Sequence, residues 1–191
     1  MTSEPRQDSK KRTILGIFIP VAIILAVAWG VLALLKSNLA PHDKATLDVK
    51  VGAVLPDLTF HRTDGSMFRL SEARAKVTLV NFWATWCEAC MEEMPSLVKL
   101  HDTYQQKGVE ILGVNLDENP ARAIATTSQE FGIRFANFID KDEALGNAFD
   151  VHAIPLTITI DSSRRILEVK SGDRNWVAPE YLKKLEAWLA Q

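Results

Sequence analysis

The chain has 191 residues, of which 47% are hydrophobic and 24% are charged, and its formal net charge is −2. This length accommodates one ordinary domain with an appendage, and the apolar fraction is sufficient for a packed core. The near-neutral charge, with Lys and Arg scattered along the chain, argues against nucleic acid as a partner.

An apolar segment near the N-terminus predicts a membrane anchor. Residues 14–35 contain no charged side chain and are rich in Ile, Leu, Val and Ala. At about 1.5 Å per residue, a helix of this length covers ~33 Å, which is enough for the hydrocarbon core of a bilayer. The segment Ala26-Val27-Ala28 is similar to a signal cleavage site, but the apolar run continues to Leu35, which favours an uncleaved anchor over a cleaved signal.

The charges beside this segment predict its orientation. Lys10, Lys11 and Arg12 directly precede it, whereas the far side offers only Lys36 close by. By the positive-inside rule, residues 1–13 stay in the cytoplasm and the remainder of the chain crosses the membrane. We therefore expect the C-terminal part in the periplasm or another extracytoplasmic space, where oxidising conditions favour disulfides.

Residues 36–50 are mixed, polar and interrupted by Pro41, and they are interpreted as a linker. A globular domain is predicted over residues 51–191. It opens with an extended piece that ends near residue 60, after which Asp64-Gly65 predicts a hairpin turn toward residues 67–70. Ser71-Glu72 indicates a short helix.

Strands and helices alternate through the rest of the domain. Val77–Trp83 is a β-branched and aromatic run, typical of a strand that is buried on both faces. We expect further strands over residues 109–115, 137–140, 156–160 and 166–170, and helices from the cysteines to about 106, then over 120–131, 144–149 and 179–190. This order predicts an α/β domain with a mixed sheet.

The only two cysteines, Cys87 and Cys90, follow the buried strand and open a helix. This places Cys87 at the helix N-terminus, where unpaired N–H groups and the macrodipole favour a thiolate. Cys90 lies one turn further on, so it can attack a mixed disulfide formed at Cys87 and release the product. Thiol–disulfide exchange needs such a pair, with one exposed nucleophile and one resolving thiol. The pattern predicts redox chemistry without a cofactor.

A metal site is the alternative for two cysteines at this spacing. A structural zinc ion takes four ligands, and the chain has no second cysteine pair. The four histidines show no ligand-like spacing; they are His42, His61, His101 and His152. We therefore predict no metal, and a chaperone that binds metal or haem through the two thiols is kept as a less favoured function.

The sequence around the cysteines resembles the thioredoxin superfamily, and within it the ResA/TlpA/DsbE group of membrane-anchored bacterial proteins. The resemblance covers about residues 51–191 together with the anchor. The matching segments are 80–90 (VNFWATWCEAC), Glu93, Pro95, 108–115 (GVEILGVN) and 151–155 (VHAIP).

This resemblance implies a thioredoxin fold with an N-terminal β-hairpin and a central αβ insertion. It also implies that the domain reduces cysteines in extracytoplasmic client proteins, notably apocytochrome c before haem attachment, and that a membrane electron donor of the CcdA or DsbD type recharges it. Ala89 stands where the group often has Pro, and Leu156 follows Pro155 where Thr is common. The first departure bears on the redox potential, and both bear on the identity of the client.

The resemblance also implies roles for residues outside the cysteine pair. Ile154-Pro155 matches the family's cis-proline, whose preceding backbone binds substrate as an added strand. Glu93 matches an acid that the family places near its thiols, and a solvated helix glutamate is the alternative. Asn81 occupies the place of a buried Asp in thioredoxin that handles protons for the resolving cysteine, which an amide cannot do.

Three further residues lie near the cysteines or the proline. Glu88 adds negative charge between the cysteines and disfavours the thiolate. Trp86 is predicted to flank Cys87 and to offer an apolar contact to clients, with a place in the core as the alternative for it or for Trp83. His152 is interpreted as a surface residue.

The function predicted from these features is that of an extracytoplasmic thiol–disulfide oxidoreductase that reduces its clients. A disulfide oxidase or isomerase is the alternative within the same class, separated by the direction of electron flow. A peroxiredoxin is disfavoured, because its peroxidatic cysteine is not normally half of a CxxC pair. With limited thiolate stabilisation, we expect a reduction potential nearer the ~−270 mV of thioredoxin than the ~−120 mV of DsbA.

Overall fold

The computed structural model describes Trp29, Gly30 and residues 46–191. The predicted anchor at residues 14–35 and most of the predicted linker lie outside these described residues. Within the described part of the chain, none of the helices combines the length and the apolar character needed to cross a bilayer. Residues 46–191 lie within one unit of the chain.

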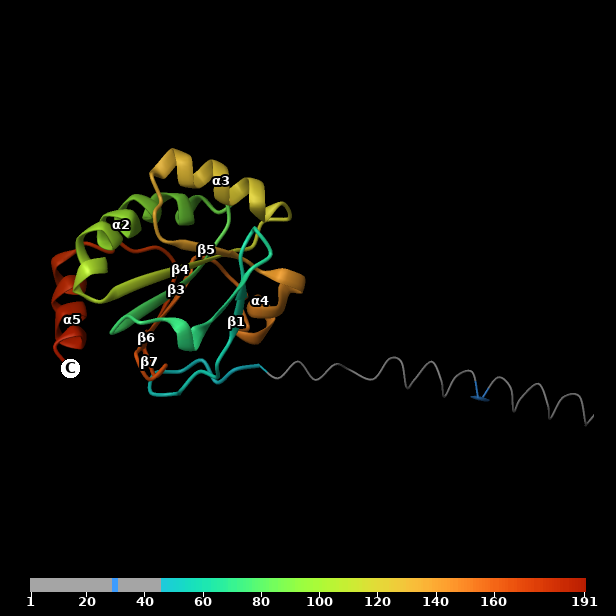
Figure 1. Ribbon diagram of the computed structural model, residues 1–191, viewed down its shortest axis with the longest axis horizontal. Coiled ribbons are helices and arrows are strands. Elements are labelled where there is room, and N and C mark those ends of the chain that lie inside the picture. Colours follow the sequence, from blue (N-terminus) through green and yellow to red (C-terminus); the bar gives the residue numbers. More distant parts are fainter. Residues whose placement is uncertain (1–28, 31–45) are drawn as a thin grey trace, which may run out of the picture. The chain divides into compact units, whose positions relative to one another are not determined.

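One mixed sheet of seven strands forms the centre of this unit, in the order β2-β1-β5-β4-β3-β6-β7 (Figure 1). Strands β3, β4 and β5 run parallel, whereas β6 and β7 on one side, and β1 and β2 on the other, join by antiparallel pairing. The strands are β1 (Thr59–His61), β2 (Met67–Arg69), β3 (Val77–Trp83), β4 (Val109–Asn115), β5 (Ala136–Ile139), β6 (Leu156–Asp161) and β7 (Ile166–Ser171). The predicted mixed-sheet α/β architecture is confirmed.

Helices cover both faces of the sheet. α2, α3 and α5 contribute to the core on one face, and α4 contributes to the core on the other (Figure 1). The helices are α2 (Glu88–Tyr104), α3 (Pro120–Phe131), α4 (Ala144–Ala148) and α5 (Pro179–Leu189), with 3-10 turns η1 (Leu70–Glu72), η2 (Gln105–Lys107) and η3 (Lys141–Glu143). The predicted helices are present, with ends close to the expected ones.

Strand β3 occupies the middle of the domain, and all of its residues are buried. Its side chains alternate between the two cores: Leu79 and Trp83 belong to the core beneath α2 and α5, whereas Val80 and Phe82 belong to the core that includes α4. Because β3 is also paired with β4 and β6, it is held on all four sides. The segment that carries the cysteines therefore starts from a fixed point.

The hairpin β1–β2 and the α3–β5 unit extend the sheet on one side, as the family resemblance implies. α3 has Pro120 at its first turn, where a missing N–H costs nothing, and it ends at Gly132 with a left-handed φ of 67°. β5 adds to β4 in parallel and begins at Ala136, slightly before the predicted range. The difference arises because Ala136 pairs with Leu112 of β4, a contact between residues far apart in the chain that the local sequence does not indicate.

The folded domain also begins before residue 51, where the sequence pattern places its start. Leu47 and Val49 pack against the core on the α4 side of the sheet. The Leu47 N–H donates to the carbonyl of Ala148 at 2.8 Å. The predicted linker over 36–50 therefore ends sooner than expected, because two apolar residues among polar ones are too few to indicate a packed segment from sequence.

Candidate active site

The two cysteines lie where β3 gives way to α2. Cys87 is the N-cap residue of α2, with an extended backbone (φ −94°, ψ 102°), and its Sγ accepts a hydrogen bond from the Cys90 N–H at 3.1 Å. The two residues form a disulfide with a Cα–Cα separation of 5.2 Å. The N-cap position leaves Cys87 Sγ facing the unpaired N–H groups of the first helical turn, which stabilise negative charge on sulfur once the disulfide is reduced.

The two sulfurs differ in their access to solvent. Cys87 retains 7% of its surface exposed, whereas Cys90 is completely buried. Attack by an external thiol or disulfide is therefore directed at Cys87, although Cys87 is less open than the exposed nucleophile that the sequence pattern predicts. The neighbouring Trp86 is 68% exposed, and Glu88 is also exposed, so both border the opening through which Cys87 is reached.

The loop before β6 lies against Cys87. The Ile154–Pro155 peptide bond is cis, as the resemblance predicts. The carbonyl oxygen of Ile154 lies 3.6 Å from Cys87 Sγ. Antiparallel pairing of β6 with β3 sets this proximity, because Leu156 pairs with Phe82 near the end of β3. The structure thus brings Cys87, Ile154 and Pro155 together, at the end of the sheet where α2 begins.

Glu93 lies one helical turn beyond Cys90, and its side chain is buried, with 3% of its surface exposed. Each carboxylate oxygen accepts one hydrogen bond: Oε1 from Asn81 Nδ2 at 2.9 Å, and Oε2 from the indole Nε1 of Trp176 at 3.0 Å. Asn81 Nδ2 also donates to the hydroxyl of Thr157 at 2.9 Å. The alternative of a solvated glutamate is therefore wrong for Glu93, and it describes the exposed Glu92 instead.

Burial governs the ionisation of Glu93. Desolvation raises the pKa of its carboxyl group, and the hydrogen bonds from Trp176 and Asn81 oppose that rise only in part. A carboxyl group in this environment can hold a proton at a pH where an exposed glutamate has lost it. Asn81 has no titratable group, so it serves as a neutral partner to the acid that lies opposite it.

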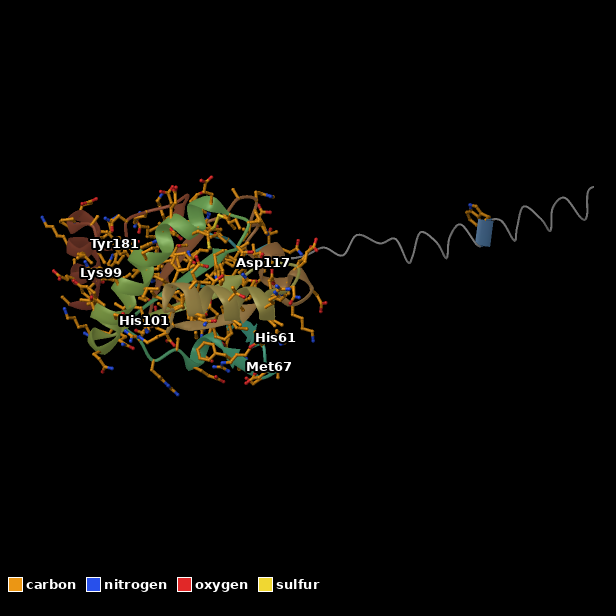
Figure 2. The ribbon with its side chains drawn as sticks, turned by 90° about the horizontal axis from the view of Figure 1, so that it is seen from above. His61, Met67, Lys99, His101, Asp117 and Tyr181 are labelled. Carbon is orange, nitrogen blue, oxygen red and sulfur yellow. A yellow bond between two sulfur atoms is a disulfide. The ribbon has the colours of Figure 1, made fainter. Side chains whose placement is uncertain are left out.

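A second polar cluster, which sequence reasoning missed, fixes the turn between β3 and α2. The Thr85 N–H and hydroxyl donate to the two carboxylate oxygens of Asp117, at 2.9 and 2.6 Å. Asn115 Nδ2 donates to the same carboxylate at 2.7 Å. In Figure 2, Asp117 lies at one end of the domain and Lys99 and His101 of α2 lie toward the other. Through its hydrogen bonds with Asn115 and Thr85, Asp117 joins the end of β4 to the turn that leads into Cys87.

The remaining sequence predictions concern Trp83, His152 and a possible metal site. Trp83 belongs to the core and donates its indole N–H to Asn137 Oδ1 at 3.1 Å, so of these two tryptophans it is Trp86 that is available for external contacts. His152 is a surface residue, as interpreted, and it lies 3.1 Å from Asp150. Among the described residues, no group of three or more His, Cys, Asp or Glu side chains is arranged to hold a metal ion.

Trp176 is a site residue that could not be found from the sequence alone. It lies between β7 and α5, 83 positions from its partner Glu93, and it is fully buried. Tryptophan is common in cores, and no local motif surrounds this one. The contact depends on tertiary packing of the loop over α2 and not on any spacing along the chain.

The cysteine pair, the adjoining cis-proline loop and the enclosed acid are the components expected of a site for thiol–disulfide exchange. A family model described as Redoxin matches residues 50–185. The chain belongs to the redoxin family. This redoxin is of the ResA/TlpA/DsbE type, and it is a thiol–disulfide oxidoreductase that carries its redox pair at Cys87 and Cys90.

Relatives and solved structures agree with this assignment. The thiol-disulfide oxidoreductase ResA of Geobacillus thermodenitrificans is 36% identical over 124 residues, which cover 65% of this chain and 71% of that protein. ResA of Bacillus anthracis is 29% identical over 166 residues, which cover 86% of this chain and 92% of that protein.

Two solved structures share the fold. A crystal structure from Chlorobium tepidum, described as a candidate DsbE thiol:disulfide interchange protein, has a TM-score of 0.66 at 22% identity, covering 74% of this chain and 99% of that one. A thiol:disulfide interchange protein from Bacteroides sp. has a TM-score of 0.63 at 21% identity, covering 76% and 93%. At these identities the structural matches establish the thioredoxin-like fold alone.

Proposed function

We propose that this redoxin reduces disulfides in client proteins on the outer side of the cytoplasmic membrane. The observation that carries the proposal is the position of Cys87 Sγ: it lies at the helix start, 3.6 Å from the Ile154 carbonyl, with Cys90 and the buried Glu93 behind it. One sulfur is thus presented to a client, and the second sulfur and an acid are kept away from solvent.

The reaction proceeds from the reduced protein in two exchanges. The Cys87 thiolate attacks one sulfur of the client disulfide, so a Cys87–client bond forms and the client's other sulfur leaves as a thiolate. Cys90 then passes its thiol proton to the Glu93 carboxylate and attacks Cys87 Sγ. The Cys87–Cys90 disulfide forms, the client's first sulfur leaves as a thiolate, and the client has gained two electrons.

Glu93 is suited to the proton transfer in the second exchange. It lies one turn after Cys90 on the same helix, in a buried site where water is not a ready proton acceptor. The pKa of its carboxyl group is raised by burial, which brings the acid nearer to the thiol in proton affinity. Asn81 accepts no proton in this scheme, because its amide donates to Glu93 Oε1.

The direction of electron flow follows from the charges around Cys87. A strongly oxidising site in this fold relies on a very stable thiolate, and hence on a reduced form that is strongly favoured. The N-terminus of α2 favours that thiolate, but the exposed Glu88, which directly follows Cys87, places negative charge nearby. These opposing charges favour a disulfide that is comparatively hard to reduce, as a reductant requires.

Client contact is assigned to the surface around Cys87. Trp86, Thr85 and Met91 line one side of a hollow of about 660 Å³, and residues of α3 line the other. An extended client segment that passes Cys87 can pair its backbone with the loop at Ile154 and place an apolar side chain on Trp86, at the edge of this hollow. Apocytochrome c is the proposed client, and a membrane protein of the CcdA or DsbD type is the proposed electron donor.

The proposed location rests on the sequence. The uncharged residues 14–35 and the cluster Lys10, Lys11 and Arg12 before them support a single anchor with the catalytic domain outside the cytoplasm. In an oxidising compartment a reductant must be recharged continually, which is why a transmembrane source of electrons forms part of the proposal.

Trapping tests the roles of the two cysteines. Cys90→Ser should accumulate mixed disulfides with clients, detected on non-reducing gels and identified by mass spectrometry, because the resolving thiol is missing. Cys87→Ser should accumulate none. Equal trapping by the two variants would contradict the assignment of Cys87 as the nucleophile.

Equilibration of the domain with glutathione or dithiothreitol tests the direction. We expect a reduction potential nearer ~−270 mV than ~−120 mV. A value near −120 mV, the value typical of a strong oxidant of this fold, would support the alternative of a disulfide oxidase and would leave the trapping result unaffected.

A further inference from the structure

The enclosed carboxylate of Glu93 is held by groups from two distant parts of the chain. Asn81, from strand β3, donates to Oε1, and Trp176, from the loop between β7 and α5, donates to Oε2. Both donors are completely buried. The indole N–H therefore fixes the rotation of the carboxylate plane, because with only one donor the group would be free to turn about its last bond.

The loop that carries Trp176 is fastened to α2 at a second point. The Ser96 hydroxyl accepts the backbone N–H of Trp176 at 3.0 Å, and it lies 2.8 Å from the carbonyl oxygen of Glu93 and 3.2 Å from that of Arg174. The side chain and the backbone of Trp176 thus both bind the turn of α2 that contains Glu93. Movement of this loop would change the setting of the acid.

The same loop contains a cation that contacts the indole. The guanidinium carbon of Arg174 lies 5.0 Å from the centroid of the Trp176 ring and 4.8 Å from that of Tyr181. Its nitrogens bind Glu168 of β7 at 2.7 and 3.2 Å, and the Arg174 and Glu168 side chains are 19% and 14% exposed. A cation over an indole withdraws electron density from it and makes its N–H a stronger donor.

We propose that Trp176 is a positioning residue for Glu93. Its indole N–H orients the Glu93 carboxylate and favours the ionised form of that group. The hydrogen bond itself is independent of the proposed function, but its effect on thiol exchange rests on the proposed role of Glu93. Trp176 lies in the loop between β7 and α5, far along the chain from the cysteines. Through its bond to Glu93, this loop takes part in setting the pH dependence of the redox reaction.

The other groups that face Glu93 set the background for this effect. Asn81 of β3 and its partner Thr157 of β6 are neutral. Asp173, at the start of the loop, acts to raise the pKa of Glu93, whereas a backbone hydrogen bond at Arg174 acts to lower it. Cys90, one turn earlier on α2, adds a negative charge when its thiol ionises. Among the groups that lower the pKa of Glu93, the Trp176 indole has the largest effect.

Nuclear magnetic resonance tests the bond in the unaltered protein. In the full chain labelled with ¹³C and ¹⁵N, the indole N–H signal of Trp176, assigned by its loss in Trp176→Phe, should shift with pH at the same midpoint as the Glu93 side-chain carboxyl carbon. Glu93→Gln should abolish that shift. An indole signal that stays constant while Glu93 titrates would overturn the proposal.

The variant Trp176→Phe then measures the strength of the effect, because it keeps an aromatic ring against Tyr181 but removes the N–H. A hydrogen bond to a charged group contributes enough to change an ionisation constant about tenfold, so we expect the acid constant of Glu93 to fall by about that factor. Trp188→Phe is the matched control, since Trp188 also packs edge-to-face on Tyr181. An unchanged Glu93 titration in Trp176→Phe, or an equal change in both variants, would refute the assignment.

Stopped-flow kinetics of mixed-disulfide resolution separates this inference from the proposed function. If Glu93 carries the proton, Trp176→Phe should move the pH midpoint of the resolution rate upward together with the Glu93 titration. If Glu93→Gln leaves the resolution rate unchanged while the indole signal still follows Glu93, the positioning bond is supported and the catalytic role of Glu93 is disproved.

Discussion

Glu93 illustrates how a single residue departs from the ordinary rules of burial. A carboxylate removed from water is costly unless its oxygens are paired, and both oxygens of Glu93 have an N–H donor. Neither donor carries a charge, so the ionised form lacks the ion pair that buried acids usually have, and burial raises the pKa of the group. A residue kept at such a cost is better explained by its chemistry than by stability.

This raised pKa has a consequence for stability that can be measured. The unfolded chain loses the Glu93 proton near the ordinary pKa of 4.5, and the folded protein loses it at a higher pH. The contribution of the group to stability is therefore complete below about pH 4.5 and is lost as the pH rises through the folded pKa. We expect Glu93→Gln to lose less stability than the wild type in this window, measured by urea unfolding of the oxidised protein.

Glu92→Gln is the matched control for that experiment, because Glu92 is the exposed neighbour on the same helix. Its pH profile of unfolding should coincide with that of the wild type. Identical profiles for Glu93→Gln and the wild type would show that the folded and unfolded proteins ionise Glu93 alike, contrary to the burial argument.

Trp86 is the other residue whose environment points to function. It is 68% exposed beside a nucleophile that is almost covered, and large exposed aromatic residues are frequent anchors in protein interfaces. We expect Trp86→Ala to weaken binding of an oxidised Cys-x-x-Cys-His peptide, which represents the proposed client, about tenfold, and to change the free energy of unfolding by no more than about 0.5 kcal/mol.

Binding of the peptide to the Cys90→Ser background, measured by the rate of mixed-disulfide formation at a series of peptide concentrations, tests this prediction. Met67→Ala is a suitable control, because Met67 is 64% exposed on the hairpin and is an apolar residue of similar accessibility. Equal losses in the two variants would indicate a general effect of surface apolar area.

The sequence was sufficient for some of these residues and not for others. Cys87 and Cys90 could be assigned because their spacing and the preceding strand are local, and the cis bond at Pro155 because the family resemblance supplies it. The sequence favours Trp86 over Trp83 for external contacts, and the exposure of Trp86 agrees, but a place in the core stayed open for either ring because a strand buried on both faces gives no alternation that marks where burial ends. Trp176 required the tertiary structure.

At the scale of elements, local signals defined the ends of most strands and helices, but not where each strand joins the sheet. The sequence indicates β5 as a short strand, yet its place between β4 and β1 depends on pairings between residues far apart, such as His61 with Ile139. The same limitation applies to the segment from Leu47, whose hydrogen bond to Ala148 joins residues 101 positions apart.

Gly113 of β4 shows how closely β3, β4 and β5 are fitted together. The Trp83 indole donates to Asn137 Oδ1 at 3.1 Å directly over this glycine. A Cβ atom at position 113 would collide with Asn137 Oδ1 and lie 3.0 Å from Trp83 Nε1. We expect Gly113→Ala to destabilise the domain by about 1–3 kcal/mol, measured by urea unfolding, because the neighbouring side chains must move within a packed core.

A double variant identifies the source of that cost. Asn137→Ala removes the atom that the new methyl group would strike, so Gly113→Ala should cost less in the Asn137→Ala background than in the wild type. Additive effects of the two substitutions would mean that the loss comes from β4 itself and not from the clash.

At the scale of the whole molecule, the sequence predicts a membrane topology in which an anchor at residues 14–35 places the domain outside the cytoplasm. A reporter enzyme that works only outside the cytoplasm should be active when fused after residue 50, and a reporter that works only inside should be inactive there, because the basic residues before Ile14 are predicted to keep the N-terminus in the cytoplasm. A mature protein that begins near Trp29 would contradict the prediction of an uncleaved anchor, but it would still agree with the prediction that the domain is exported.

The attachment of the β1–β2 hairpin gives the domain unequal local stability. Within the described chain, β1 meets β5 through the single register pair His61–Ile139, and Phe60 and Phe68 pack on Phe138 with ring centroids 5.2 and 5.5 Å away. Few backbone bonds must break for the hairpin to detach, whereas β3 is paired along its whole length with β4 and from Val77 to Phe82 with β6. Amide hydrogens of the hairpin should therefore exchange with solvent through a partial opening, long before those of β3, while the disulfide and its acid stay enclosed.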